Sequence, residues 1–103
     1  MTNESHEWAL ILGSSSGFGA ATAVELARSG MNVFGVHLDL RSTLPNAQRA
    51  VAEVESLGRR AVFFNTNAAD AAKRAATLES IRDTLRAQGD DAYVRVFMHS
   101  LAF

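Results

Sequence analysis

Several kinds of residue are scarce in this 103-residue sequence, and each scarcity narrows the possible chemistry. It has no cysteine, which excludes a disulfide framework, a thiolate metal site and a cysteine nucleophile. It has no excess of positive charge, because ten Lys and Arg residues stand against eleven Asp and Glu residues. A net charge of -1 provides no basic field to hold a nucleic-acid backbone or an anionic membrane surface. Neither nucleic acid nor a membrane is therefore an expected partner, and no spacing of His, Asp or Glu suggests a metal site.

Long apolar segments are missing as well. The apolar stretch Trp8–Leu12 is far shorter than the roughly 20 residues that a membrane-spanning helix needs. The first seven residues are polar and carry two glutamates where a signal peptide has positive charge. The remaining composition, with 48% apolar and 20% charged residues, is typical of one soluble globular unit, for which we expect a cytoplasmic location.

Apolar runs and helical periodicity alternate along the chain. The predicted strands are Trp8–Leu12, Val33–His37, Ala61–Asn65 and Val94–Met98. The predicted helices lie at Phe18–Ser29, between the capping pair Ser42-Thr43 and Gly58, and between the capping residue Asp70 and Gly89. The last has Leu78, Ile81 and Leu85 on its buried face. Gly35 fits inside a strand only if a backbone or ligand approaches closely there. A βαβαβαβ order with short connections predicts an α/β fold with a parallel sheet.

The strongest chemical signal is the glycine-rich loop Gly13–Gly19 between the first predicted strand and helix. Glycines there permit a sharp turn, a close approach of a pyrophosphate to the backbone, and tight packing of helix on strand. The N–H groups and positive dipole of the helix N-terminus then face the phosphates. This context predicts a dinucleotide site rather than an ordinary tight turn. The loop lacks the Gly-Lys-Ser/Thr ending of a P-loop, which disfavours a P-loop nucleotide triphosphatase. The candidate residues are Gly13, Ser14, Ser15, Ser16, Gly17, Phe18 and Gly19.

The spacing Gly-x-x-x-Gly-x-Gly, with serines between the glycines, resembles the fingerprint of the short-chain dehydrogenase/reductase family. The resemblance covers nearly the whole chain. It implies an NAD(P)-dependent oxidoreductase with a Rossmann-type, doubly wound parallel sheet. Residues 1–103 would then form the N-terminal, dinucleotide-binding βαβαβαβ part of a single domain, and the catalytic part would lie outside them.

The resemblance also places residues around the adenosine. Asn67 and Ala68 follow the third strand, where the family usually has an Asp-Val pair that meets the adenine amine. After the second strand, His37 takes the place of the usual acid, while Asp39 lies two residues further on and either binds a ribose or points to solvent. An acid favours the ribose hydroxyls of NAD, whereas Arg41 suits the 2′-phosphate of NADP, and we lean to NADP(H) over NAD(H).

The end of the fourth strand departs from the ordinary family pattern Asn-Asn-Ala-Gly. The segment Met98–Phe103, which contains His99, Ser100 and Leu101, is similar to enoyl-acyl carrier protein reductases, where it passes beside the nicotinamide and its ribose. That similarity implies hydride transfer to a 2-enoyl thioester, as in fatty acid biosynthesis. The alternatives are a 3-ketoacyl or alcohol-type short-chain reductase, and a non-catalytic NAD(P)-binding sensor module.

The family's catalytic tyrosine, with a lysine one helical turn later, has no counterpart here. The single tyrosine, Tyr93, and the single lysine, Lys73, stand in the wrong order and on different elements. No catalytic residue is therefore assigned, and the chain alone is expected to be inactive. An exposed edge with Val94, Val96 and Phe97 is expected on the fourth strand. The expected partners are the remainder of the polypeptide, a small-molecule or acyl-thioester substrate, and further copies in a homotetramer.

Overall fold

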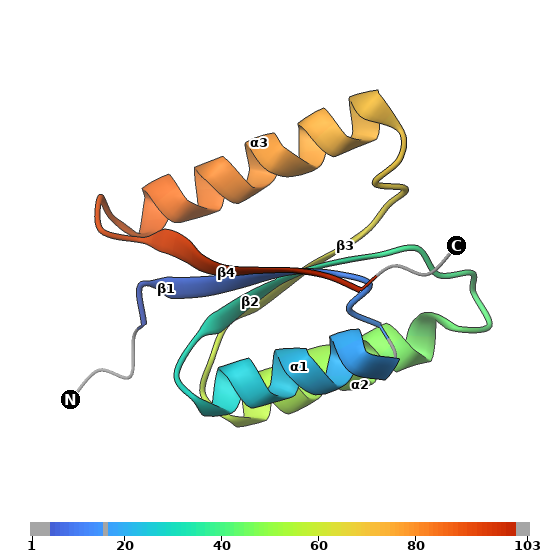
Figure 1. The fold of residues 1–103 in the computed structure, drawn as a ribbon, viewed down its shortest axis with the longest axis horizontal. Coiled ribbons are helices and arrows are strands. Elements are labelled where there is room, and N and C mark those ends of the chain that lie inside the picture. The colour runs from blue at the N-terminus through green and yellow to red at the C-terminus, as the bar shows by residue number, and fades with distance from the viewer. Residues whose placement is uncertain (1–4, 16, 101–103) are drawn as a thin grey trace.

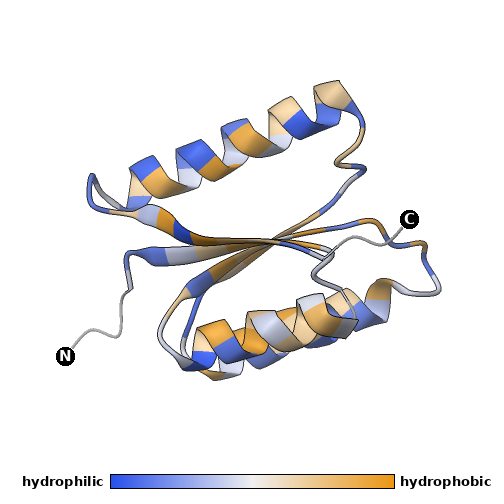
Figure 2. Cartoon of the chain, viewed as in Figure 1, coloured by the Kyte–Doolittle hydropathy of each residue, from blue (hydrophilic) through white to orange (hydrophobic). Residues whose placement is uncertain are grey.

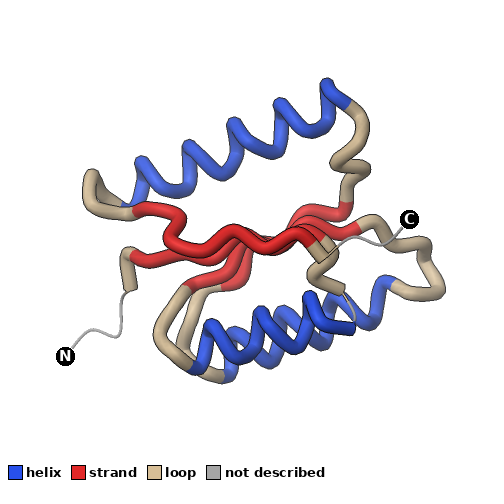
Figure 3. Tube along the Cα trace, in the orientation of Figure 1, coloured by secondary structure: helices blue, strands red, loops and turns tan. Residues whose placement is uncertain are grey.

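The computed structural model of the chain describes residues 5–15 and 17–100. Strands and helices alternate throughout these residues (Figures 1 and 3). The strands are β1 (Glu7–Leu12), β2 (Asn32–His37), β3 (Ala61–Asn65) and β4 (Tyr93–His99). The helices are α1 (Gly17–Arg28), α2 (Leu44–Ser56) and α3 (Ala71–Gln88). Each element predicted from the sequence is present, and its ends lie within two residues of the predicted ones.

The strands of the described chain form one parallel sheet in the order β3-β2-β1-β4. Helices α1 and α2 cover one face of this sheet and α3 covers the other, so that the molecule has three layers (Figure 1). The prediction of an α/β, doubly wound parallel sheet is confirmed. The central strands β1 and β2 are buried almost throughout, as expected for strands covered on both faces.

Local signals explain where the helices begin and end. At the end of α1, Gly30 has a φ of 110°, and its N–H and that of Met31 donate to the carbonyls of Ala27 and Leu26 in a Schellman motif. Asp70 caps α3 as predicted, accepting a hydrogen bond from the Lys73 N–H at 3.0 Å.

The start of α2 lacks the side-chain capping hydrogen bond that the sequence predicts. Thr43 occupies the N-cap position, but its side chain makes no capping hydrogen bond. Its hydroxyl instead donates to the Leu40 carbonyl oxygen at 3.2 Å, and it also contacts Asp39. The hydroxyl therefore holds the loop before α2, and a capping pattern in the sequence does not predict this hydrogen bond.

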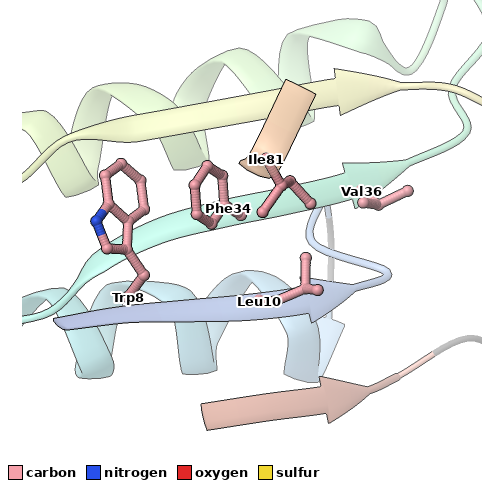
Figure 4. Packing of buried hydrophobic residues seen from close by; sticks show 5 residues of the cluster. All are labelled: Trp8, Leu10, Phe34, Val36 and Ile81. Carbon is pink, nitrogen blue, oxygen red and sulfur yellow. The ribbon is translucent and has the colours of Figure 1, made fainter. Parts of the chain in front are cut away.

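The core on the α3 side of the sheet is centred on two stacked rings, Trp8 of β1 and Phe34 of β2, whose centroids are 4.0 Å apart. Leu10 and Val36 continue this row along the same two strands, and Ile81 of α3 closes it from above (Figure 4). The opposite face packs against α1 and α2 through small and branched side chains, namely Ile11, Ala23, Ala27, Val33 and Val54.

Helix α3 packs less closely than its sequence pattern predicts. Ile81 is buried and Leu85 is partly buried, but Leu78 is 54% exposed, which corrects its assignment to a buried face. Leu78 borders an apolar hollow of about 260 Å³ between α3 and the sheet, and Phe97 of β4 lines the same hollow. The helical spacing was therefore right, but no described side chain fills the space that Leu78 faces.

The edge strand β4 carries exposed apolar surface, as expected. Phe97 is 61% exposed, while Val94 and Val96 are half-buried. Figure 2 shows apolar colouring along the sheet and a mixed pattern on α3. Among the described residues, no helix has both the length and the apolar character needed to cross a membrane.

Candidate nucleotide-binding site

The carboxyl ends of the strands meet at one edge of the sheet, and this brings most of the predicted site residues together. The Ser100 N–H donates to the Leu12 carbonyl at 2.8 Å, which joins the end of β4 to the end of β1. The Thr66 N–H donates to the His37 carbonyl at 2.8 Å, which joins the end of β3 to that of β2. In open α/β sheets this edge is where ligands bind, at the point where the strand order reverses.

The glycine-rich loop takes the shape that the sequence predicts. Gly13 and Gly17 have φ values of 89° and 60°, conformations that side chains with a Cβ rarely adopt. Gly19 has no room for any side chain, since a Cβ there would lie 1.7 Å from the Gly13 carbonyl oxygen. The first turn of α1 is thus pressed against the end of β1, and its backbone faces the carboxyl edge. Ser16 lies outside the described residues.

The loop is also held against β2. The Gly13 and Ser14 N–H groups both donate to the Val36 carbonyl, at 2.8 and 3.3 Å. The Ser14 side chain is completely buried, and its hydroxyl has no hydrogen-bond partner within the described chain. A Cβ on Gly35 would lie 2.5 Å from this hydroxyl and 2.8 Å from the Phe63 ring. The close approach that a glycine in β2 predicted is therefore present, and it comes from the loop and from β3.

Beyond β2, the Asp39 carboxylate is turned inward. It lies 2.8 Å from Nδ1 of the buried His37 ring, and only 9% of the Asp39 side chain is exposed. Of the two alternatives left open for Asp39, the one in which it points to solvent is therefore wrong. Burial by itself raises the pKa of this carboxyl. The polar side chains of Thr43, Ser15 and His37 around it outweigh that effect and hold the pKa of Asp39 below its ordinary value.

The backbone of Asp39 is fixed separately, by Asn65 at the end of β3. The Asn65 Oδ1 accepts a hydrogen bond from the Asp39 N–H at 2.9 Å, and its Nδ2 donates to the Asp39 carbonyl at 3.2 Å. No sequence pattern marks Asn65 as a site residue. Its only signal is its register opposite His37 in the parallel ladder, which a sequence does not display.

The other predicted residues lie around the same edge. Asn67 is exposed, and its Oδ1 already accepts a hydrogen bond from the Ala69 N–H at 3.0 Å. Ala68 packs against the Trp8 cluster, and its carbonyl accepts from Arg74 at 3.0 Å. The remaining candidates are Arg41 and His99, which are exposed, Phe18, which is 83% exposed, Ser100, which is half-buried, and Leu101, which lies outside the described residues.

Tyr93 and Lys73 are separated by the fold as well as by the sequence. Tyr93 begins β4 and pairs with Glu7 at the amino end of β1, opposite the glycine loop. Lys73 lies in the first turn of α3. These two residues therefore form no tyrosine–lysine pair.

The loop Gly-x-x-x-Gly-x-Gly lies between the first strand and the first helix of a parallel sheet. Known proteins with the same arrangement can now be compared with this chain. The family model described as "short chain dehydrogenase" matches residues 7–89. This chain belongs to the short-chain dehydrogenase family. A search among curated proteins gave no significant match.

Solved structures agree with the family assignment. A putative short-chain alcohol dehydrogenase from Sinorhizobium meliloti 1021 is 28% identical, with a TM-score of 0.67 over 81% of this chain and 31% of that one. Acetoin dehydrogenase from Enterobacter cloacae is 21% identical, with a TM-score of 0.76 over 96% and 36%. Carveol dehydrogenase from Mycobacterium avium, solved in complex with NAD, is 24% identical, with a TM-score of 0.68 over 78% and 32%. This chain thus spans about a third of the length of these short-chain dehydrogenases.

Proposed function

We propose that residues 1–103 form the N-terminal, dinucleotide-binding part of an NAD(P)-dependent oxidoreductase of the short-chain dehydrogenase family. The observation that carries this proposal is the loop Gly13–Gly19, in which Gly13 and Gly17 have positive φ and Gly19 packs directly on the Gly13 carbonyl. Such a loop leaves space for a diphosphate beside the backbone at the start of a helix.

The residues of this chain would bind and orient the nucleotide, which supplies the hydride when bound. The loop and the first turn of α1 would hold the diphosphate through backbone N–H groups and the helix dipole. Asn67 and Ala68 would line the adenine. His99, Ser100 and Leu101 would lie near the nicotinamide end, and Phe18, which is largely exposed, would contact the ribose or ring. Proton transfer would need a tyrosine that these residues do not include.

Two glycines provide a matched test of the loop. Gly17 and Gly58 have φ values of 60° and 79°, and apart from the adjoining backbone no heavy atom lies within 4 Å of a Cβ built on either. Gly17→Ala and Gly58→Ala should therefore lower the free energy of unfolding by similar amounts, about 1 kcal/mol, from backbone strain. Only Gly17→Ala should weaken NADH and NADPH binding, by about tenfold or more, because its Cβ would intrude on the diphosphate. Isothermal titration calorimetry measures both affinities.

Equal affinities in the two variants would contradict the proposal, because the glycine loop would then be only a turn. The same outcome would favour an ordinary structural role for the whole segment. Loss of binding in both variants, with intact folding, would also contradict it, since Gly58 lies at the end of α2 and away from the loop.

For the substrate, two classes are proposed. The segment from His99 onward is similar to enoyl-acyl carrier protein reductases, which favours reduction of a 2-enoyl thioester. The putative alcohol dehydrogenase, acetoin dehydrogenase and carveol dehydrogenase among the similar structures favour the alternative, reduction of a carbonyl or oxidation of an alcohol. Oxidation of NADPH or NADH with an enoyl thioester, compared with ketone and 3-ketoacyl substrates, distinguishes the two. Binding of nucleotide without turnover of either class would favour the sensor module.

As cofactor we propose NADP(H) in preference to NAD(H). The Asp39 carboxylate is enclosed, whereas Arg41 is exposed on the same loop. A guanidinium matches the 2′-phosphate of NADP in charge and geometry. A homotetramer remains the proposed assembly, to be checked by light scattering after size-exclusion chromatography.

A further inference from the structure

The connection between β2 and α2, residues 38–43, carries Arg41, and a strand that is distant in the sequence holds its middle. The Asn65 side chain at the end of β3 forms hydrogen bonds with both polar main-chain groups of Asp39. Its Oδ1 accepts from the Asp39 N–H at 2.9 Å, and its Nδ2 donates to the Asp39 carbonyl at 3.2 Å. One side-chain amide thus satisfies the main chain of a residue that belongs to neither a helix nor a strand.

These hydrogen bonds replace main-chain bonds at the point where the sheet ends. His37 and Asn65 are the last paired residues of β2 and β3, and the Thr66 N–H donates to the His37 carbonyl at 2.8 Å. If the parallel ladder continued, the N–H and carbonyl of Asp39 would bond to main-chain groups beyond Asn65. The Asn65 amide provides both partners instead. The chain therefore leaves the sheet toward α2 while Asp39 stays next to β3.

Arg41 lies two residues after Asp39, inside a closed turn. The Leu40 carbonyl accepts a hydrogen bond from the Thr43 N–H at 3.0 Å, which closes a turn around Arg41. The Arg41 side chain is exposed. The backbone of Arg41 is therefore held by the Asn65 hydrogen bonds on one side and by this turn on the other, and its position determines which region the guanidinium can reach.

We propose that Asn65 is a positioning residue for nucleotide selectivity, which holds the β2–α2 connection so that Arg41 meets the 2′-phosphate of NADPH. The inference rests on the proposed function, since it concerns how the nucleotide site distinguishes NADPH from NADH. NADH lacks this phosphate, so a displaced Arg41 weakens the binding of NADPH alone. The glycine loop, which would hold the diphosphate of both nucleotides, takes no part in the hydrogen bonds of Asn65 to Asp39.

The test measures the affinities of both nucleotides. Asn65→Ala should weaken NADPH binding about three- to tenfold, because the connection that holds Arg41 loses its hydrogen bonds to β3. NADH binding should change by less than about twofold, below the effect of one hydrogen bond. In protein that already carries Arg41→Ala, Asn65→Ala should change NADPH binding by less than about twofold, because both substitutions remove the same interaction. Isothermal titration calorimetry provides the dissociation constants.

Asn32 provides a matched control at the opposite end of the sheet. Its side chain also bonds to the main chain of distant segments, donating to the Ser5 carbonyl at 2.7 Å and accepting from the Arg60 N–H at 2.9 Å. Asn32→Ala should lower the unfolding temperature but leave the ratio of the NADPH and NADH dissociation constants unchanged. A second variant, Asn65→Thr, lacks the amide but keeps a residue that favours strands, and it should lower NADPH affinity as Asn65→Ala does. Near-ultraviolet circular dichroism shows which variants are folded.

The outcomes separate this inference from the function on which it rests. If the unaltered protein binds neither nucleotide, the proposed function fails and this inference fails with it. If Arg41→Ala leaves NADPH binding unchanged, the proposed preference for NADP(H) fails, again together with this inference. If Arg41→Ala weakens NADPH binding but both Asn65 variants do not, or if they weaken both nucleotides equally, only this inference is overturned. Additive effects of the Asn65 and Arg41 substitutions, or an equal change of the ratio in Asn32→Ala, also overturn it.

Discussion

Ser14 and Gly35 determine how closely the glycine loop approaches the sheet. The Ser14 side chain is completely buried, its hydroxyl has no hydrogen-bond partner among residues 5–15 and 17–100, and Gly35 lies close to it in β2. A buried hydroxyl without a partner destabilises the fold. The contact nevertheless permits the loop to donate two backbone hydrogen bonds to Val36. Close packing of the loop is thus kept at the expense of one hydrogen bond.

Substitutions at these two positions should change stability in opposite directions. Gly35→Ala should lower the free energy of unfolding by about 1 to 3 kcal/mol, because its Cβ meets the Ser14 hydroxyl and the Phe63 ring. Ser14→Ala should raise it by up to about 1 kcal/mol, because the unpaired hydroxyl is removed. Urea unfolding followed by the fluorescence of the single tryptophan, Trp8, measures both. A Gly35→Ala variant as stable as the parent would mean that the loop relaxes without penalty.

At the scale of elements, helices and strands were predictable because their signals are local. The buried run of β1, the glycine that ends α1 and the Asp70 cap of α3 each depend on neighbours in the sequence. The inward turn of Asp39 and the clamp by Asn65 depend on strands that meet only in the fold, so no sequence pattern reports them. For the same reason the sequence context predicts a site at the glycine loop, whereas only the structure shows the inward turn of the Asp39 carboxylate.

Helix α3 shows the same division between local pattern and packing. Helical spacing places Leu78 and Ile81 on one face, yet Ile81 is buried and Leu78 is 54% exposed beside the apolar hollow. Ile81→Ala should therefore lower the free energy of unfolding by about 2 to 4 kcal/mol. Leu78→Ala, the same kind of truncation one turn earlier, should lower it by less than about 1 kcal/mol. Chemical denaturation of the two variants provides the comparison. Equal losses would show that Leu78 is covered in solution by further protein.

At the scale of the whole molecule, one end of the sheet carries a stabilising side-chain network and the other carries the proposed nucleotide site. The amino end is closed by a network around Trp8, whose Nε1 donates to Gln88 at 2.6 Å and whose ring lies beneath the Arg60 guanidinium at 5.2 Å. Ser5 and Asn32 join that network, since the Ser5 carbonyl accepts from both Gln88 and Asn32. The carboxyl end carries the glycine loop, Asp39 and the strand ends that line the proposed nucleotide site.

Because these two ends lie a strand length apart, stability and nucleotide binding should be separable. Trp8→Phe removes the hydrogen bond to Gln88 and leaves its oxygen unpaired, which should lower the free energy of unfolding by about 1 to 3 kcal/mol. The dissociation constants for NADH and NADPH should remain within about twofold of the parent values, since distant, independent sites do not couple. Thermal unfolding gives the first quantity, and calorimetric titration of the folded variant gives the second. A large loss of affinity in Trp8→Phe would show instead that the packing of β1 and β2 transmits strain along the strands, so that the Trp8 network sets the shape of the glycine loop.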